Sequence, residues 1–117
     1  MQEGFPFDIS RPWGSMRQFS LNVSTTVKLI TVNPNEVLSL QSHNKRQEFW
    51  RVISGSGVFE INGEKREVGV GSEAMVEIGA HHRVSAGGDG MQFLEIAFGE
   101  FDEEGDIVRY EDKYGRV

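Results

Sequence analysis

The sequence predicts an all-β, single-domain fold, an antiparallel barrel of the jelly-roll type. Apolar and polar residues alternate from about residue 26 to 98, and glycine, asparagine or proline interrupts the alternation every few residues. The length of 117 residues suits one domain with one core, and 14 glycines beside 3 prolines favour tight turns. Many short strands at this spacing are typical of a jelly roll.

Each expected strand is a short alternating run bounded by turn residues. The runs cover 26–32, 37–42, 48–53, 57–61, 73–78, 82–86 and 91–98, with turns at 33–35, 54–57, 62–63, 69–71 and 87–90. The Ser-Gly-Ser-Gly segment at 54–57 is interpreted as a hairpin turn and not as a phosphate loop, because no Lys-Ser/Thr pair follows it. Around the single domain, 1–117, we expect an N-terminal arm over about 1–25, a tail over about 100–117, and a short helix within 106–114.

Composition narrows the classes of function. A net charge of −6 without a basic stripe argues against nucleic-acid binding, and the absence of cysteine excludes disulfides and thiol chemistry. No signal-peptide pattern opens the chain, and no apolar run approaches the roughly 18 residues of a membrane span. We therefore expect a cytoplasmic domain without membrane contact. Open sheet edges and the apolar residues Phe5, Phe7, Phe19 and Leu21 predict a homodimer.

Metal-binding residue types gather in two segments. Gln41 and His43 are two positions apart, so they share one face of a strand, and Glu48 immediately precedes the next apolar run. His82 lies in the later segment, on the face opposite to its neighbour His81. Two imidazoles with oxygen donors suit zinc, manganese, iron, cobalt or nickel better than calcium. The sequence thus predicts one divalent metal ion, zinc first, held by Gln41, His43, Glu48 and His82, although Gln41 has an alternative as a hydrogen-bond partner of His43 or of water.

These residues resemble the two cupin motifs. The spacing of the first motif is met by Gln41, His43, Glu48 and Gly55, with glutamine in place of the first histidine. The spacing of the second is met by Gly71, Gly79 and His82. Two positions depart from the pattern, because Glu77 replaces the usual proline and Ala86 the usual asparagine.

Longer segments, 11–15, 39–50, 54–57, 81–83 and 105–116, resemble the type II mannose-6-phosphate isomerase domain. That cupin domain is usually the C-terminal part of a bifunctional isomerase and mannose-1-phosphate guanylyltransferase, and Gln41 is a variation of that family. No glycine-rich nucleotide loop precedes the segments, so we expect the domain to stand alone. The resemblance implies an enzyme that interconverts mannose 6-phosphate and fructose 6-phosphate, with a small phosphorylated sugar as its ligand.

The isomerase hypothesis gives roles to further residues. Its proton transfer needs a metal ion that polarises the sugar oxygens and a nearby base. The candidates for catalysis are Arg46 and Glu95. The residues expected to bind the substrate are Arg11, Trp50, Lys113 and Arg116. Two alternatives stay open: a non-catalytic cupin that binds a phosphosugar or sugar nucleotide as a regulatory partner, and a metal-dependent cupin oxygenase, against which the glutamine at position 41 counts.

Overall fold

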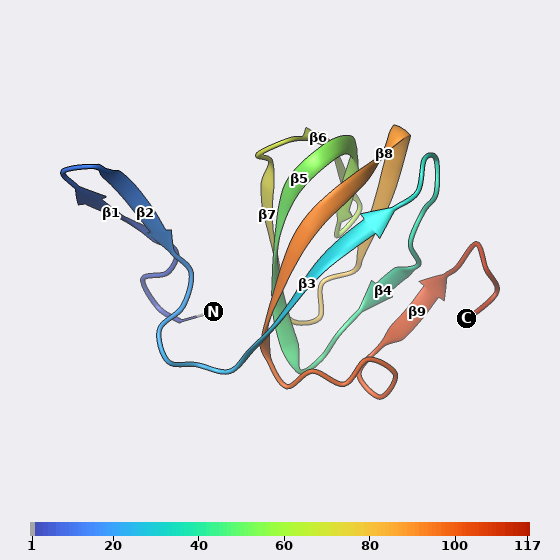
Figure 1. Cartoon of the computed structure of the whole chain (residues 1–117). Helices are drawn as coiled ribbons and strands as arrows, with labels where there is room; N and C mark the ends of the chain where they lie inside the picture. The colour runs from blue at the N-terminus through green and yellow to red at the C-terminus, as the bar shows by residue number, and fades with distance from the viewer. Residues whose placement is uncertain (1) are drawn as a thin grey trace.

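The protein is an antiparallel β-barrel with a separate two-stranded hairpin (Figure 1). The computed structural model describes residues 2–117, and no helix occurs among them, so this range holds none that could cross a membrane. The strands are β1 Phe7–Arg11, β2 Gly14–Gln18, β3 Thr25–Val32, β4 Leu40–Ser42, β5 Arg46–Ile61, β6 Glu64–Gly69, β7 Glu73–Val76, β8 His82–Gly99 and β9 Val108–Glu111. The prediction of an all-β single domain is confirmed.

Two long strands, β5 and β8, form the centre of the sheet. They pair from Arg46↔Gly99 to Ile61↔His82, with register shifts beside Gly55. Gly55 has a φ of +74°, and a Cβ at this position would lie 2.1 Å from the carbonyl oxygen of Gly90. The predicted hairpin turn at 54–57 and the predicted turn at 87–90 are therefore wrong. The glycines form bulges that bend two continuous strands, since only glycine permits this backbone conformation and this close approach.

The turn at 62–63 agrees with its prediction, and the segment 106–114 does not. Asn62 and Gly63 both have positive φ, and they form the tight turn predicted between β5 and β6. The short helix predicted within 106–114 is wrong, because β9 pairs with β4 there. As a strand, β9 forms hydrogen bonds with the backbone groups at the edge of β4, which a helix in this segment would leave unpaired.

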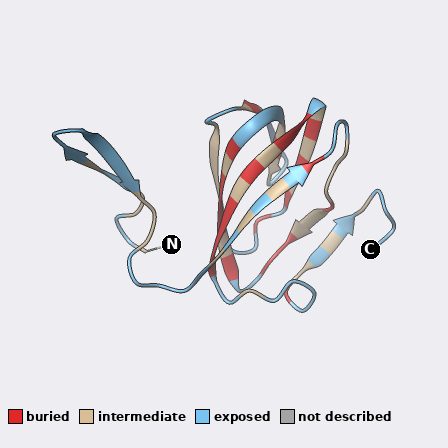
Figure 2. Ribbon diagram, viewed as in Figure 1, coloured by how far each residue is buried: buried red, intermediate tan, exposed pale blue. Residues whose placement is uncertain are grey.

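The main core fills the barrel between β5 and β8, where Figure 2 shows the buried positions concentrated. Trp50 lies at its centre, with ring centroids 4.9 Å from Phe59 and 5.5 Å from Phe93 in edge-to-face contacts. Burying such aromatic side chains stabilises the barrel by about 2 to 3 kcal/mol each. A smaller cluster on the outer face of the sheet contains Phe49 and Ile96.

The N-terminal hairpin stands apart from the barrel. Its strands β1 and β2 pair with each other and with no other strand of residues 2–117. Phe19 anchors the segment that follows β2, with its ring centroid 4.8 Å from that of Phe49. Arg17 adds an ion pair to Glu73 of β7. The hairpin is thus tied to one side of the barrel at its base.

Candidate metal centre

Three buried side chains converge at one end of the barrel: His43 after β4, Glu48 on β5 and His82 at the start of β8. Their candidate ligand atoms all lie within 4.8 Å of one another. The Nε2 atoms of His43 and His82 are 3.5 Å and 3.7 Å from the two carboxylate oxygens of Glu48. Glu48 faces inward because it alternates in phase with the core residues Trp50 and Val52.

Hydrogen bonds set the tautomer of both imidazoles. Nδ1 of His43 donates to the carbonyl of Asp106 over 2.8 Å, and Nδ1 of His82 donates to the carbonyl of Ala80 over 2.9 Å. Burial lowers the pKa of both histidines, so both are neutral near pH 7 with a lone pair on Nε2. Nε2 of His82 is buried and has no hydrogen-bond partner within residues 2–117. A buried nitrogen that has a lone pair, lacks a hydrogen-bond partner and lies beside a carboxylate is suited to bind a divalent metal ion.

The predicted catalytic residue Arg46 lies within this cluster. Its Nε donates to Glu48 over 3.0 Å, and its Nη2 donates to Nε2 of His43 over 3.1 Å. The ring of Phe101 covers the guanidinium, with its centroid 4.2 Å from Cζ. Burial alone raises the pKa of Glu48, but the adjacent His82 and the bond from Arg46 outweigh it and lower the pKa. Glu48 is therefore an anion that balances the guanidinium.

The other predicted catalytic residue, Glu95 of β8, lines the same cavity. Burial, followed by the negative charge of Glu48, raises the pKa of Glu95 to about 8. Its carboxyl group is hydrogen-bonded to Glu48. Glu95 thus carries a proton at neutral pH and donates it to the Glu48 carboxylate.

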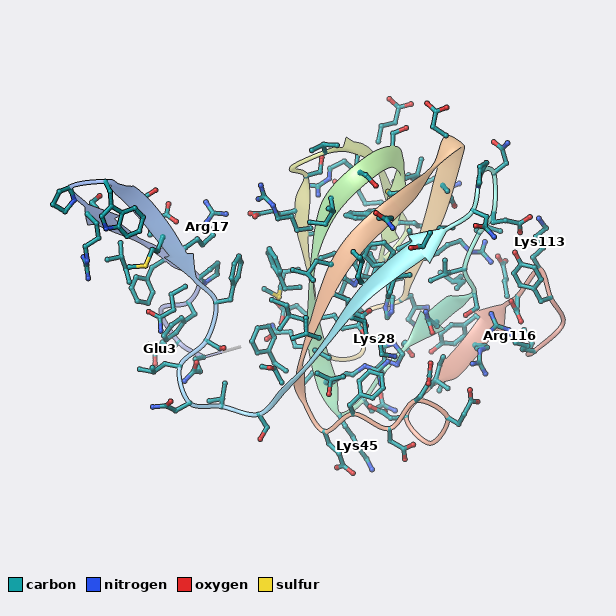
Figure 3. The ribbon with its side chains drawn as sticks, in the orientation of Figure 1. Glu3, Arg17, Lys28, Lys45, Lys113 and Arg116 are labelled. Atoms are coloured by element: carbon teal, nitrogen blue, oxygen red, sulfur yellow. The ribbon has the colours of Figure 1, made fainter. Side chains whose placement is uncertain are left out.

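The cavity beside these residues has a volume of about 160 Å³. Gln41 lines it and is the register partner of His82 across β4 and β8. Four basic side chains line it as well: Lys28, Arg46, Arg109 and Arg116. Figure 3 shows two of them, Lys28 on β3 and Arg116 on the C-terminal tail. One small cavity therefore joins a metal-binding cluster to a basic wall.

Three residues expected to bind substrate do not line this cavity. Arg11 ends β1 in the separate hairpin, where it donates to the carbonyl of Ser10. Lys113 is held outside by an ion pair of 2.9 Å to Glu36. Trp50 lies beneath the site in the core, although its Nε1 donates to Glu48 over 3.2 Å. Of the substrate-binding set, the structure brings Arg116 alone to the cavity.

Sequence reasoning missed two of the basic residues. Lys28 alternates in phase with Ile30, which packs on the core, so the strand pattern contained a signal that Lys28 points inward. Arg109 was hidden because its segment was expected to be helical, whereas it belongs to β9. His81 points away from the site, as expected, and its ring stacks on Tyr110 with centroids 4.1 Å apart.

The jelly-roll barrel and the histidine–glutamate donor set define a cupin. The chain belongs to the family described as "Mannose-6-phosphate isomerase C-terminal", whose model matches residues 4–112. A similar solved structure is a cupin protein from Bacteroides fragilis, with 25% identity and a TM-score of 0.61 over 74% of this chain and 75% of that one. The capsular polysaccharide assembling protein CapF from Staphylococcus aureus, 20% identical, shares the fold with a TM-score of 0.65 over 91% of this chain and 32% of its own.

Curated relatives correct the predicted activity. The chain is 38% identical over 111 residues to the mannose-1-phosphate guanylyltransferase ManC of Salmonella typhimurium. It is 35% identical over 110 residues to the xanthan biosynthesis protein XanB of Xanthomonas campestris. The matched regions cover 94% and 93% of this chain but only 23% and 24% of those proteins. These names describe guanylyl transfer and polysaccharide synthesis, which contradicts the prediction that the chain interconverts mannose 6-phosphate and fructose 6-phosphate.

Proposed function

We propose that this chain is a metal-dependent binding domain for a phosphorylated sugar. One observation carries the proposal: the cavity that meets the His43–Glu48–His82 cluster is also lined by Lys28, Arg109 and Arg116. A bound divalent ion would attract the oxygens of the sugar. Guanidinium groups pair with two phosphate oxygens at once and suit the other end of such a ligand.

Zinc is the metal we propose, ahead of manganese, iron, cobalt and nickel. Two imidazoles and a carboxylate are a common donor set for zinc sites that keep a position open for a ligand. Gln41 lines the cavity and would add an oxygen donor or orient a metal-bound water. The chain has no cysteine, so the donors are nitrogen and oxygen only.

The cavity volume favours a sugar monophosphate over a sugar nucleotide. The cavity of about 160 Å³ is several times larger than the space that one bound water molecule needs. That space holds a sugar ring or a phosphate with part of the ring, whereas a nucleotide would extend far outside. The name of the Salmonella typhimurium relative makes mannose 1-phosphate a natural ligand to test, beside mannose 6-phosphate. We also propose that the protein forms a dimer. Within residues 2–117, strands β1 and β2 of the N-terminal hairpin pair only with each other.

Isothermal titration calorimetry tests the proposal. We expect zinc-loaded protein to bind mannose 1-phosphate or mannose 6-phosphate with heat that disappears after chelation, and to bind mannose far more weakly. GDP-mannose measures the preference for the smaller ligand. Equal affinity for mannose and for both mannose phosphates, or sugar-phosphate binding that survives complete removal of the metal, would overturn the proposal.

A further inference from the structure

Each of the four lysine and arginine side chains that line the cavity is already paired with a carboxylate. The pairs are Lys28–Glu103 over 3.6 Å, Arg46–Glu48 over 3.0 Å, Arg109–Glu104 over 3.3 Å and Arg116–Asp112 over 2.7 Å. An anion that enters the cavity therefore meets no unpaired lysine or arginine among the lining residues that the structure describes. To form an ion pair of its own, it has to displace one of the four carboxylates.

Two of the four carboxylates are held firmly. Glu48 is buried and belongs to the proposed metal donor set. Asp112 accepts hydrogen bonds from three groups of Arg116: from the backbone N–H and Nε over 2.7 Å each, and from Nη2 over 3.1 Å. Displacement of Asp112 would break all three bonds, one of them to a backbone group. The pairs of Arg46 and Arg116 are therefore not the ones that an entering anion breaks.

The carboxylates of Glu103 and Glu104 are held loosely. Both residues belong to the segment 100–107 between β8 and β9, which crosses the end of the barrel where β4 and β5 are joined (Figure 1). Their side chains are 68% and 76% exposed, and their ion pairs are 3.6 Å and 3.3 Å long. An exposed ion pair of this kind changes an equilibrium by about fivefold at most. An anion can therefore displace these two carboxylates at small cost.

Glu104 contacts Arg109 in the way that a phosphate would. Its Oε1 accepts a hydrogen bond from Nη2 over 3.3 Å, and its Oε2 accepts one from Nη1 over 3.5 Å. Guanidinium groups bind two phosphate oxygens in the same two-point manner. Glu103 itself lines the cavity beside Phe101, whose ring centroid lies 4.2 Å from Nζ of Lys28. The two glutamates thus occupy contacts that a bound phosphate requires.

We propose that Glu103 and Glu104 determine which anions the cavity binds, an inference that rests on the proposed function: they compete as internal ligands for Lys28 and Arg109, and a phosphate group displaces both. A phosphate monoester carries about −1.5 to −2 charges near pH 7 and has three free oxygens, so it can replace two carboxylates at once. Lys28 and Arg109 line the same cavity of about 160 Å³, which brings both within reach of one phosphate group.

A monovalent anion gains little by the same exchange. A free carboxylate offers Arg109 no more charge and no better geometry than the carboxylate of Glu104 already does. The glutamate also belongs to the same chain, so its effective concentration at the guanidinium is on the order of millimolar. A carboxylate at lower concentration does not displace it. The two exposed glutamates thereby exclude carboxylates and admit phosphates.

Calorimetry of the zinc-loaded chain, titrated with mannose 6-phosphate and separately with inorganic phosphate, tests the proposal. We expect Glu103→Gln and Glu104→Gln each to bind both ligands about twofold to fivefold more tightly than the wild type, and the double variant to bind them more tightly still. Glu100→Gln is the matched control, because Glu100 lies in the same segment, is 68% exposed, and pairs with Lys45 outside the cavity. It should leave both affinities unchanged.

Paired substitutions and a competing anion test the mechanism. The gain from Glu104→Gln should disappear in an Arg109→Ala background, and the gain from Glu103→Gln in a Lys28→Met background, because no cation is then left to release. Sodium acetate should weaken phosphate binding more in the double variant than in the wild type. Gains that persist in both backgrounds, or equal weakening by acetate, would overturn the proposal.

The calorimetry also separates this role of the glutamates from the proposed function. A wild type that binds mannose 6-phosphate only with zinc, beside glutamate variants that bind it no more tightly, would overturn the role of the glutamates and leave the proposed function intact. So would an equal gain in Glu100→Gln. A wild type that binds neither mannose phosphate would overturn the proposed function. Inorganic phosphate then decides the role of the glutamates, since the double variant must bind it more tightly than the wild type.

Discussion

The carbonyl oxygen of Asp106 accepts a hydrogen bond from Nδ1 of His43 over 2.8 Å, which joins the C-terminal segment to the metal centre. The carboxylate of the same residue accepts hydrogen bonds from the backbone N–H groups of Asn44 and Lys45, over 2.8 Å and 2.9 Å. Asp106 thus fixes both the tautomer of a ligand and the loop that carries it. The tail beyond the barrel is part of the site's support.

Substitution of Asp106 should therefore weaken metal binding without removing a ligand. Asp106→Ala keeps the backbone carbonyl that bonds to His43 but removes the carboxylate that holds Asn44 and Lys45. We therefore expect zinc affinity to fall by about tenfold, the lower end of the effect of losing a group that supports a metal-binding histidine. Competition titration with a chromogenic chelator measures this affinity. Asp89→Ala, at an exposed position, is the matched control, and equal affinities for the two variants would show that Asp106 has no positioning role.

Substitution of the adjacent histidines His81 and His82 should have different effects on metal content. His82→Ala removes a buried residue of the proposed donor set and should lose most of the bound metal, as determined by elemental analysis of protein dialysed against zinc. His81→Ala should retain full occupancy, because its ring stacks on Tyr110 and faces away from the cluster. Loss of metal in the His81 variant with retention in the His82 variant would contradict the assigned donor set.

Arg46 should oppose metal binding electrostatically. Its guanidinium donates to His43 and to Glu48, two of the three proposed ligands. Two unit charges about 4 Å apart interact by roughly 4 kcal/mol at an effective dielectric constant of about 20. Arg46→Gln should accordingly bind zinc at least about tenfold more tightly. Lys45→Gln, which removes an exposed charge, is the control for net charge, and equal gains in both variants would count against the specific effect.

Glu95 should make the stability of the metal-free protein depend on pH. Between about pH 4.5 and 8, the folded protein retains a proton on Glu95 that the unfolded chain has released. The free energy of unfolding therefore falls as the pH rises through this window. Urea titrations in the presence of a chelator should show this decline, and Glu95→Gln should flatten it. An unchanged slope in the variant would mean that Glu95 is ionised in the folded state.

Two arginines of the tail should contribute unequally to phosphate binding. Arg109 has a side chain only 14% exposed, pairs with Glu104 over 3.3 Å, and has a buried Nε that finds no hydrogen-bond partner in the described part of the chain. Arg116 is 51% exposed and pairs with Asp112 over 2.7 Å. Arg109→Ala should weaken binding of a mannose phosphate by about tenfold to a hundredfold, and Arg116→Ala by less. Calorimetry with Lys113→Ala as the control measures both. A larger loss for Lys113→Ala would move the phosphate site away from this cavity.

Strand alternation and motif spacing were sufficient to predict the barrel and the convergence of His43, Glu48 and His82. The in-phase positions of Gln41 and His43, and of Glu48 and Trp50, depend only on neighbours in sequence, so period-two reasoning applies. Strand continuity did not follow. A glycine at a bulge looks like a glycine at a turn until its partner is known, and the contact that decides the matter, Gly55 with Gly90, spans distant parts of the chain.

Local sequence patterns also could not predict which basic side chains line the cavity. Lys113 and Arg116 are three positions apart in sequence, yet Lys113 pairs with Glu36 and Arg116 lines the cavity. Long, flexible side chains are directed by distant partners that no spacing rule supplies. Lys28 lies at the site because β3 pairs with β8, and this pairing joins segments that are far apart in the sequence.

The bent β5–β8 ribbon has a consequence for the order of folding. Glu48 pairs with Ala97, whereas His82 pairs with Ile61, so the two ligands belong to opposite ends of the same ribbon. They meet because the glycine bulges fold that ribbon over on itself. If the ribbon of β5 and β8 were flat, with all its ladder hydrogen bonds formed, these two residues would lie far apart. Metal uptake during refolding would therefore report when the barrel closes, and not the earlier step in which the strands pair.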